Sequence, residues 1–321
     1  MRWFRQQPAP TPAPAPRTST VAALTPRVLM IVHDPRIPSE RGRRLHEVFG
    51  WHDPDALAQQ YIADLATVSA GTLRYQIVER IDADFFPPKL DGFAYGADEF
   101  VTRWRAGRQM HQPDALDYPA RIAHFDLIRR YERGDFDEVW VFSFPYAGEY
   151  ESTMIGDSAF WCNSPPVGVA RCGRGRFVMM GFNYERDVGC MLENFGHRTE
   201  SIMERVYQGV PPAHNLWQQF IQYDRIAPGR AACGNVHFAP NSSADYDWGN
   251  RRQVLSTCDV WLDFPRIDQP ARLVDCRDWG AGDMRLHHLW WFARLPHAAG
   301  TARGINNDWW PYIVDPNTVP A

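Results

Sequence analysis

Lysine is almost absent from this chain of 321 residues: Lys89 is the only one, and all other basic residues are arginines. A phosphate-binding loop of the GxxxxGK(S/T) type is therefore missing, because that loop needs a lysine to contact the phosphates. Schiff-base chemistry would depend on Lys89 alone, which directly follows two prolines. The composition thus excludes nucleotide hydrolysis by a P-loop and disfavours lysine-based covalent catalysis.

A strong charge of one sign and a long apolar run are also missing. The formal net charge is -4 at pH 7, so no basic field attracts phosphates, and no nucleic acid is expected as a partner. No run of about 18 apolar residues occurs, the length that a membrane-spanning helix requires. We therefore predict no membrane span, while the oligomeric state stays unknown.

Cysteine pairs with C-x-x-C spacing are absent, which argues against a structural zinc knuckle. The chain nevertheless contains six cysteines, an even number that permits disulfides in an oxidising compartment. The candidate disulfides join Cys258 to Cys276 and Cys162 to Cys172.

The N-terminus lacks the apolar core of a signal peptide. Residues 7–16 are instead rich in proline and alanine, which is typical of a semi-rigid linker. We interpret residues 1–26 as a flexible linker and residues 27–321 as a single α/β catalytic domain. The linker, the cysteine number and the tryptophan content favour an extracytoplasmic, secreted enzyme whose export segment was removed or replaced before Met1. A cytoplasmic protein is the alternative.

Aromatic residues are abundant: 13 Trp, 12 Tyr and 18 Phe make up 13% of the chain. Such side chains fill cores, and they also form flat platforms for sugars and peptides. Most of them are expected in the core.

Apolar runs and helical periodicity alternate along the first two thirds of the chain. Residues 28–32 are a continuous apolar run, typical of a strand buried on both faces. Because helices follow strands, the pattern predicts an α/β fold with a mostly parallel open sheet flanked by helices, and a long loop-rich C-terminal portion packed on it. Strands are expected at 28–32, 73–81, 139–144 and 177–182, and helices at 54–71, 119–133, 187–207, 217–223 and 286–295.

Polar groups follow the expected strands at the edge where open α/β sheets bind ligands. The ionisable groups that follow three of the four strands are His33 with Asp34, Glu149 with Glu151, and Glu185. We expect catalytic carboxylates among these glutamates, with Asn183 and Tyr184 as substrate contacts. The alternative is ordinary loop polarity, because strand ends lead to polar loops in most proteins.

One face of the expected helix 187–207 carries Glu193, His197, Glu200 and Glu204 at spacings of four, three and four. His197 with Glu193 or Glu200 can hold a divalent metal, and the candidates for the third ligand are His237 and the pair His287-His288. This face lies opposite the apolar stripe, so a solvated surface is the alternative. Three acids around one histidine repel one another, and a cation would relieve that repulsion.

The segment that follows His237 adds further polar groups. Asp245 and Asp247 lie close to His237 in sequence and can contact substrate or bind calcium, although an Asx-rich turn is the alternative. Trp248 and His288 are further candidates for substrate binding.

These patterns favour a divalent-metal-dependent hydrolase that acts on peptide bonds. The expected ion is zinc, held by Glu193, His197 and His237, because zinc acidifies a bound water towards a pKa of roughly 7. Glu200 is expected as a ligand or general base, and Glu185 as an acid or a substrate contact.

Two alternatives stay open. A glycoside hydrolase would use Glu149 or Glu151 with Glu185 as its carboxylate pair. A non-catalytic protein would bind glycans or peptides through its aromatic loops. The tryptophans expected as platforms are Trp161, Trp248, Trp309 and Trp310.

Overall fold

The computed structural model of this chain describes residues 22–169 and 171–319. Most of the linker predicted for residues 1–26 lies outside the described residues. Its last residues are attached to the domain, because the Leu24 amide donates a hydrogen bond to the Thr72 carbonyl at 2.8 Å.

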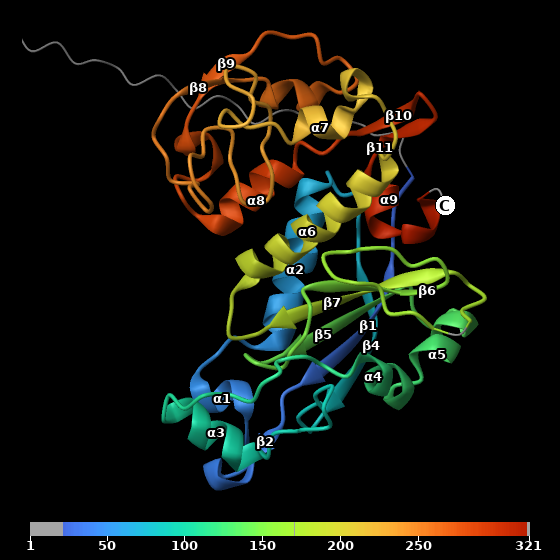
Figure 1. The fold of residues 1–321 in the computed structure, drawn as a ribbon, viewed down its shortest axis with the longest axis vertical. Helices are drawn as coiled ribbons and strands as arrows, with labels where there is room; N and C mark the ends of the chain where they lie inside the picture. The colour runs from blue at the N-terminus through green and yellow to red at the C-terminus, as the bar shows by residue number, and fades with distance from the viewer. Residues whose placement is uncertain (1–21, 170, 320–321) are drawn as a thin grey trace, which may run out of the picture.

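A five-stranded sheet forms the centre of the molecule, in the order β4-β1-β5-β7-β6 (Figure 1). All neighbouring strands are parallel except β6, which runs antiparallel to β7 at the edge. The predicted α/β fold with a mostly parallel sheet is therefore confirmed. The five strands are β1 (Arg27–His33), β4 (Gln76–Ala83), β5 (Glu138–Ser143), β6 (Ser152–Gly156) and β7 (Arg176–Asn183).

Helices cover both faces of this sheet. In β1, Val28, Met30 and Val32 pack in the core on the side of helices α2 (Pro54–Val68) and α6 (Val188–Val206). The alternate residues of β1 face the core beneath α4 (Tyr118–His124) and α5 (Leu127–Arg133). Burial on both faces explains the continuous apolar run of β1.

Two local predictions were wrong. The single helix expected at 119–133 is split into α4 and α5 at Asp126, whose φ of 53° is left-handed. Strand β6 was not predicted, because only Met154 and Ile155 among its five residues are large and apolar.

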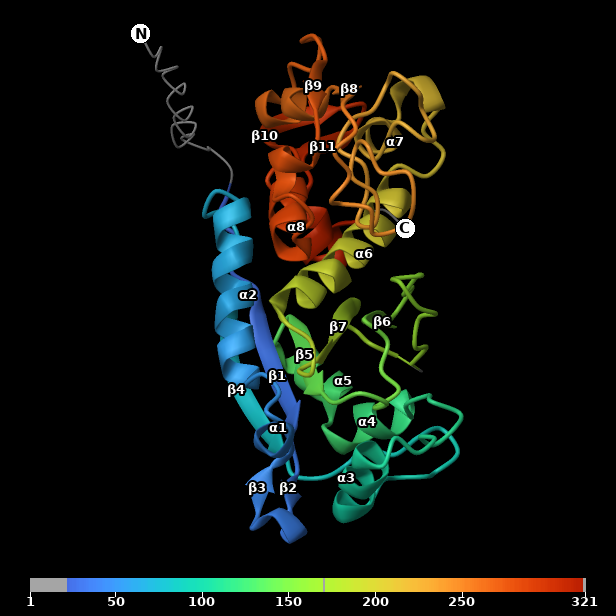
Figure 2. The same ribbon diagram turned by 90° about the vertical axis from the view of Figure 1, so that its left-hand side faces the viewer.

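The loop-rich C-terminal portion packs against α6, on the opposite side from α4 and α5 (Figure 2). Its regular elements are short: α7 (Leu216–Phe220), α8 (Met284–Phe292), α9 (Trp310–Val314), β8 (Val254–Ser256), β9 (Arg272–Val274), β10 (His297–Ala302) and β11 (Ile305–Asp308). Near the other end of the molecule lie α1 (Leu45–Phe49), α3 (Ala97–Arg105), β2 (Arg36–Ile37) and β3 (Arg43–Arg44). Short 3-10 helices occur at Pro38–Glu40, Pro212–His214, Cys258–Asp263, Cys276–Trp279 and Pro316–Thr318.

Tryptophan fills the core of the C-terminal portion. The rings of Trp217, Trp261 and Trp309 pack around Phe220 with centroid separations of 5.1 to 6.0 Å. Trp309 and Trp310 are fully buried, whereas Trp161 is 58% exposed. Trp309 and Trp310 are therefore core residues and cannot serve as the ligand platforms that the sequence predicted.

All six cysteines are free, so the two predicted disulfides do not form. Cys162 and Cys172 belong to different core clusters. The Cys258 sulfur lies 3.5 Å from the Asp259 carboxylate instead of meeting Cys276.

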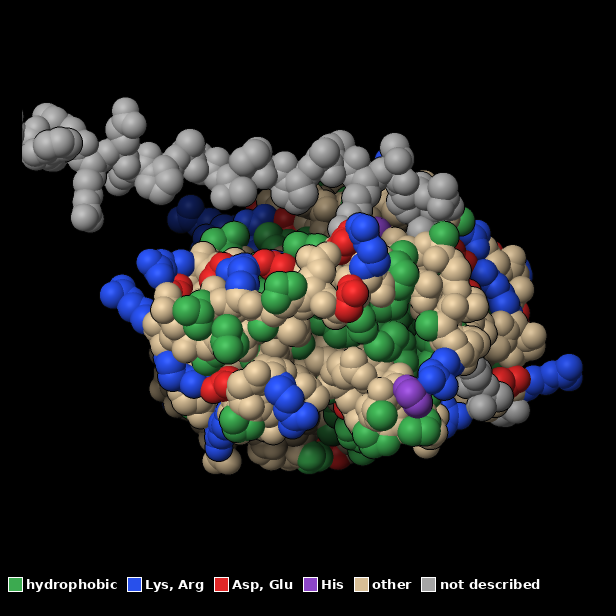
Figure 3. Space-filling view, turned by 90° about the horizontal axis from the view of Figure 1, so that it is seen from above, with side chains coloured by type: hydrophobic (Ala, Val, Ile, Leu, Met, Phe, Trp, Pro, Cys, Tyr) green, Lys and Arg blue, Asp and Glu red, His purple; other side chains and the backbone are tan. Residues whose placement is uncertain are grey.

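Within the described ranges, no helix has both the length and the apolar character needed to cross a bilayer. Seen from above, onto the C-terminal portion, arginine side chains are spread around the rim with acidic side chains between them (Figure 3). That face therefore carries no continuous basic field.

A buried ion pair attaches α6 to the sheet. Arg198 is fully buried, and its Nη1 lies 2.7 Å from Oε2 of Glu138 at the start of β5. The same guanidinium donates hydrogen bonds to the carbonyls of Ile313 and Val314 at the end of α9. Tyr75 and Trp140 donate to the Glu138 carboxylate at 3.1 and 2.7 Å. The Arg198 guanidinium of α6 thus binds both strand β5 and helix α9.

Replacing one partner of this pair should destabilise the fold strongly. Arg198→Met or Glu138→Gln alone leaves a buried charge without its counter-charge, and we expect a loss of about 3–5 kcal/mol in the free energy of unfolding by urea. The exposed Arg129→Met variant is the control, with an expected loss below about 1 kcal/mol. Equal effects of the Arg198 and Arg129 variants would contradict this account.

Candidate metal centre

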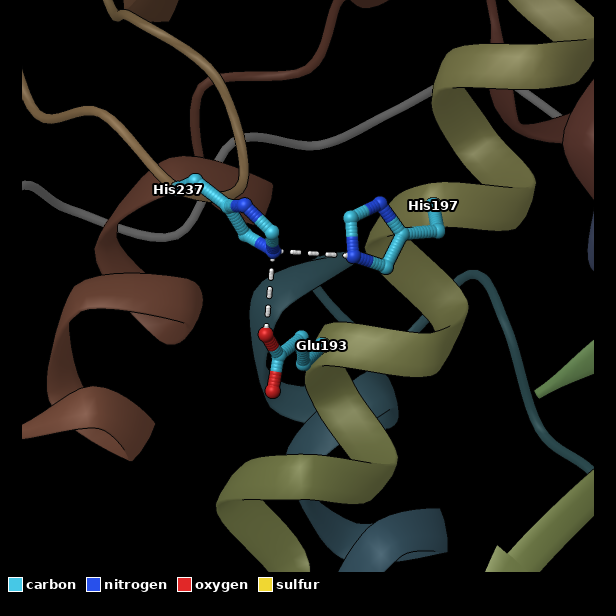
Figure 4. A group of neighbouring side chains, drawn as sticks. All are labelled: Glu193, His197 and His237. Atoms are coloured by element: carbon cyan, nitrogen blue, oxygen red, sulfur yellow. Dashed lines mark hydrogen bonds and ion pairs between the residues drawn. The ribbon is translucent and has the colours of Figure 1, made fainter. Parts of the chain in front are cut away.

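Three side chains converge where α6 meets the loop after α7 (Figure 4). Glu193 and His197 lie one turn apart on α6, and His237 comes from the loop. The Nε2 atoms of the two histidines are 3.0 Å apart, and His237 Nε2 is 3.1 Å from Glu193 Oε1. One ligand atom from each residue lies within 4.8 Å of the other two. The three candidate ligands of the sequence prediction therefore share one site.

A glycine in α6 allows the loop to approach this closely. A Cβ atom added at Gly196 would lie 2.5 Å from a methyl carbon of Val236, the residue before His237. The Val236 amide donates a hydrogen bond to Glu200 Oε1 at 3.1 Å. The Asn235 side chain accepts hydrogen bonds from the His237 and Phe238 amides, which closes an Asx turn. Glycine costs helix stability relative to alanine, by about 0.5–1 kcal/mol, and here it gives the loop room.

A carboxylate meets the outer nitrogen of each histidine ring. His197 Nδ1 lies 3.1 Å from Glu200 Oε2, and His237 Nδ1 lies 3.0 Å from Asp245 Oδ1. Such carboxylates fix the tautomer and orientation of metal-binding histidines, and they raise the basicity of the inner nitrogen. Glu200 thus positions His197, in place of the predicted role as ligand or base, and Asp245 positions His237.

His237 Nε2 has more polar neighbours than one nitrogen can satisfy. It lies within 3.1 Å of His197 Nε2, Glu193 Oε1 and the Tyr246 hydroxyl. A neutral ring nitrogen offers either one proton or one lone pair. When both Nδ1 atoms donate to their carboxylates, two lone pairs face each other at 3.0 Å. A cation between them would satisfy both rings and the Glu193 carboxylate together.

The charges of these groups respond to one another. Burial raises the pKa of Glu193, but hydrogen bonds from His237 and Tyr246 outweigh it and lower the pKa overall. The hydrogen bond to Glu193 raises the pKa of His237 against the effect of burial. For His197, burial lowers the pKa, and the Glu200 carboxylate reverses this to a net increase. Without a metal, the two histidines therefore bind protons more readily than free histidine does.

A cavity of about 530 Å³ opens beside this group, between the carboxyl ends of β5 and β7 and the start of α6. Glu193 and Tyr246 belong to its wall, so one of the three candidate ligands and a neighbour of His237 border the cavity. Glu151 also lines it, with Oε2 at 4.0 Å from His197 Nε2 and a hydrogen bond from Asn163. Glu151 is thus a cavity-lining carboxylate close to His197 that is not one of the three candidate ligands.

Strand-end residues divide between the cavity and the core. Asn183 and Glu149 line the cavity, although Glu149 also forms an ion pair with Arg121 at 2.6 Å. Glu185 is not part of the cavity wall. Tyr184 is buried, and its hydroxyl donates a hydrogen bond to the His33 carbonyl. Glu185 and Tyr184 therefore lie outside the site that the sequence placed them in.

Three other predicted contacts are structural. The Asp247 carboxylate accepts hydrogen bonds from Ser243 and Asn250, which close a turn in place of a calcium site. Trp248 is buried and stacks on His287. His288 is fully buried, with Nε2 at 3.2 Å from the Val236 carbonyl, and burial lowers its pKa to about 4. His288 supports the loop of His237 from behind.

Tyrosines at the cavity were missed by the sequence reasoning. Tyr246 contacts both His237 and Glu193, and burial raises its pKa, so its hydroxyl stays protonated near neutral pH. In the sequence Tyr246 lies between Asp245 and Asp247, and only these two carboxylates were predicted as substrate contacts. Tyr146 and Tyr150 also line the cavity, and these residues are 43% and 45% exposed.

Comparison of this chain with protein-family models, curated proteins and solved structures gives no match in any of the three.

Zinc should stabilise this protein more at about pH 8 than at about pH 6. Without metal, the raised histidine pKa values contribute stability below the usual value of 6.5, and this contribution is lost as the pH rises through them. Zinc needs neutral rings, and at 100 times its Kd it adds about 2.7 kcal/mol. Thermal unfolding with zinc or chelator measures the difference.

The matched variants for this measurement lie on one helix. Glu193→Gln removes a candidate ligand and should abolish most of the zinc-dependent increase in Tm. Glu204→Gln changes an exposed carboxylate of α6 outside the group and should retain it. A zinc effect that Glu193→Gln leaves intact would place the ion elsewhere.

Proposed function

We propose that this protein is a divalent-metal-dependent hydrolase of peptide bonds, with Glu193, His197 and His237 as the metal ligands. One observation carries the proposal: two imidazole nitrogens and a carboxylate point at one position on the edge of a cavity, and a carboxylate backs each ring. Three protein ligands beside an open cavity are typical of catalytic zinc sites.

The donor set favours zinc over calcium. Two imidazoles and one carboxylate suit zinc, which keeps a fourth position for water or substrate. Calcium takes six to eight oxygen ligands, and this group offers one carboxylate. Within residues 22–169 and 171–319, it is the only group of histidine, cysteine and acidic side chains close enough to hold a metal.

Two residues of the cavity wall have roles in the proposed reaction. Glu193, His197 and His237 would hold the metal, which would supply Lewis-acid chemistry for an attacking water and the substrate carbonyl. Glu151 would take a proton from the water that attacks the carbonyl carbon. The C–N bond then breaks, and Glu151 passes the proton to the leaving amine. The Tyr246 hydroxyl donates a hydrogen bond to the developing oxyanion.

The glycoside-hydrolase alternative has weaker support. Its carboxylate pair needs Glu185, which is not part of the cavity wall, and Glu149 is already paired with Arg121. Trp248 and Trp309 are buried and offer no platform. A binding protein without turnover is tested by the experiment that follows.

Removing the central ligand should remove metal and activity together. We expect purified wild-type protein to contain about one zinc per chain and His197→Ala to lose both the zinc and the release of new amino groups from a peptide mixture. The control, His214→Ala, changes an exposed histidine on the Pro212–His214 turn. A metal-free protein that still cleaves peptides would refute the proposal. A zinc-loaded protein that binds peptides and leaves them intact would identify a binding protein.

Replacing the proposed base should separate chemistry from metal binding. Glu151→Gln keeps the shape of the side chain but cannot accept the proton, so kcat should fall about 10²–10⁴-fold. Metal analysis should show unchanged zinc, because Glu151 is not one of the three ligands. Unchanged kcat would assign the base role to another group.

A further inference from the structure

A buried carboxylate oxygen in the cavity wall has no partner. The Glu149 side chain is 7% exposed, and Arg121 of α4 donates a hydrogen bond to its Oε1 at 2.6 Å. The second oxygen, Oε2, is buried without a hydrogen-bond partner. Glu149 lines the cavity, whereas Arg121 lies behind it. A buried acceptor without a partner costs free energy, and a donor on a ligand in the cavity would remove that cost.

A glycine lies next to the free oxygen of Glu149. Gly181 of β7 also lines the cavity, and a Cβ atom added there would lie 3.3 Å from Glu149 Oε2 and 2.3 Å from the Tyr150 carbonyl. Any side chain at Gly181 would therefore crowd the free oxygen. Because Arg121 holds the other oxygen, the Glu149 carboxylate is oriented before a donor arrives.

The charged residues of the cavity wall favour the binding of a cation. Its charged residues are Asp114, Glu149, Glu151, Glu193 and a single basic residue, Arg186. Lys89 and Arg121 neutralise Asp114 and part of Glu149 from behind. Glu149 and Glu151, two positions apart in the chain, both line the cavity, and Glu149 Oε2 has no hydrogen-bond partner among the described residues.

Aromatic rings at the cavity add a second attraction. Tyr146, Tyr150 and Tyr246 line it, and each of these residues is 43% to 49% exposed. Tyrosine faces attract ammonium groups and also pack against apolar side chains. A peptide end with an ammonium group and an apolar side chain fits both features.

We propose that Glu149 binds the free α-ammonium group of a peptide substrate, so that the enzyme acts on peptides with an unblocked amino terminus. This inference rests on the proposed hydrolase function, and it names the substrate class of the same cavity. An ammonium group brings three donors, and one of them would pair with Glu149 Oε2. The cavity of about 530 Å³ accommodates a short peptide end and not a folded chain.

Arg186 favours a different substrate less strongly. It could attract the carboxylate of a peptide C-terminus, but it is exposed and already hydrogen-bonded to Cys190. Exposed charges hold ligands weakly because water and salt screen them. A preference set by the C-terminus is an outcome of the experiment below.

The test compares one short peptide in three forms with the zinc-loaded wild-type protein: unblocked, N-acetylated and C-amidated. We expect kcat/KM to be at least about tenfold higher for the unblocked than for the acetylated form, because acetylation removes the charge that pairs with Glu149. Amidation should change kcat/KM little. Equal use of unblocked and acetylated peptide, or a loss on amidation alone, would overturn the proposal.

Variants then assign the preference to Glu149. Glu149→Gln should reduce the discrimination between the two forms, while Glu132→Gln on the exposed side of α5 should keep it. Glu149→Gln could fail to fold because Arg121 loses its counter-charge. In that case the comparison of the three peptides with the wild-type protein still tests the proposal.

Binding separates this inference from the hydrolase proposal. Calorimetry with leucinamide and N-acetyl-leucinamide requires no turnover. Zinc-loaded protein that cleaves none of the peptides but binds leucinamide at least about tenfold more tightly would refute the hydrolase and support recognition by Glu149. Equal or absent binding of the two amides would refute the recognition itself.

Discussion

The ion pair between Arg198 and Glu138 fixes the orientation of α6, and the candidate metal centre depends on that orientation. Arg198 directly follows His197, and successive residues of a helix point about 100° apart. Because Arg198 is held in the core by Glu138 and by two carbonyls of α9, the neighbouring histidine is turned outward to the loop. Burying a charge is costly unless it is paired, so few other rotations of this helix are accessible.

Features that repeat along the chain could be predicted from the sequence, and features that depend on burial could not. The strands and α6 carry long periodic patterns, and the helical spacing of Glu193 and His197 identified two of the three converging ligands. The same spacing could not show that Glu200 meets the outer nitrogen of His197. A metal ligand and a carboxylate that orients His197 would both lie on the same face of the helix. Trp248 and His288 have chemically suitable side chains, yet the core encloses both.

The C-terminal portion shows why local sequence patterns could not predict the whole site. Its short elements are held by tryptophan rings and loop hydrogen bonds from positions far apart in sequence, such as the Trp291 indole donating to the Gly234 carbonyl. His237 and Tyr246 reach the site through this packing. Sequence reasoning could select His237 for its chemistry but could not place it, and it passed over Tyr246, whose role follows only from proximity.

The contact between Gly196 and Val236 has a consequence for ion selectivity. The loop rests directly on the helix backbone at this point, so the gap between the two imidazole nitrogens is set by the thickness of one aliphatic side chain. A bulkier residue on either side would widen that gap, and a smaller one in place of Val236 would narrow it. If the proposed metal binds here, two residues without a polar atom in their side chains would set the spacing of its ligands and hence the ionic radius that these can enclose.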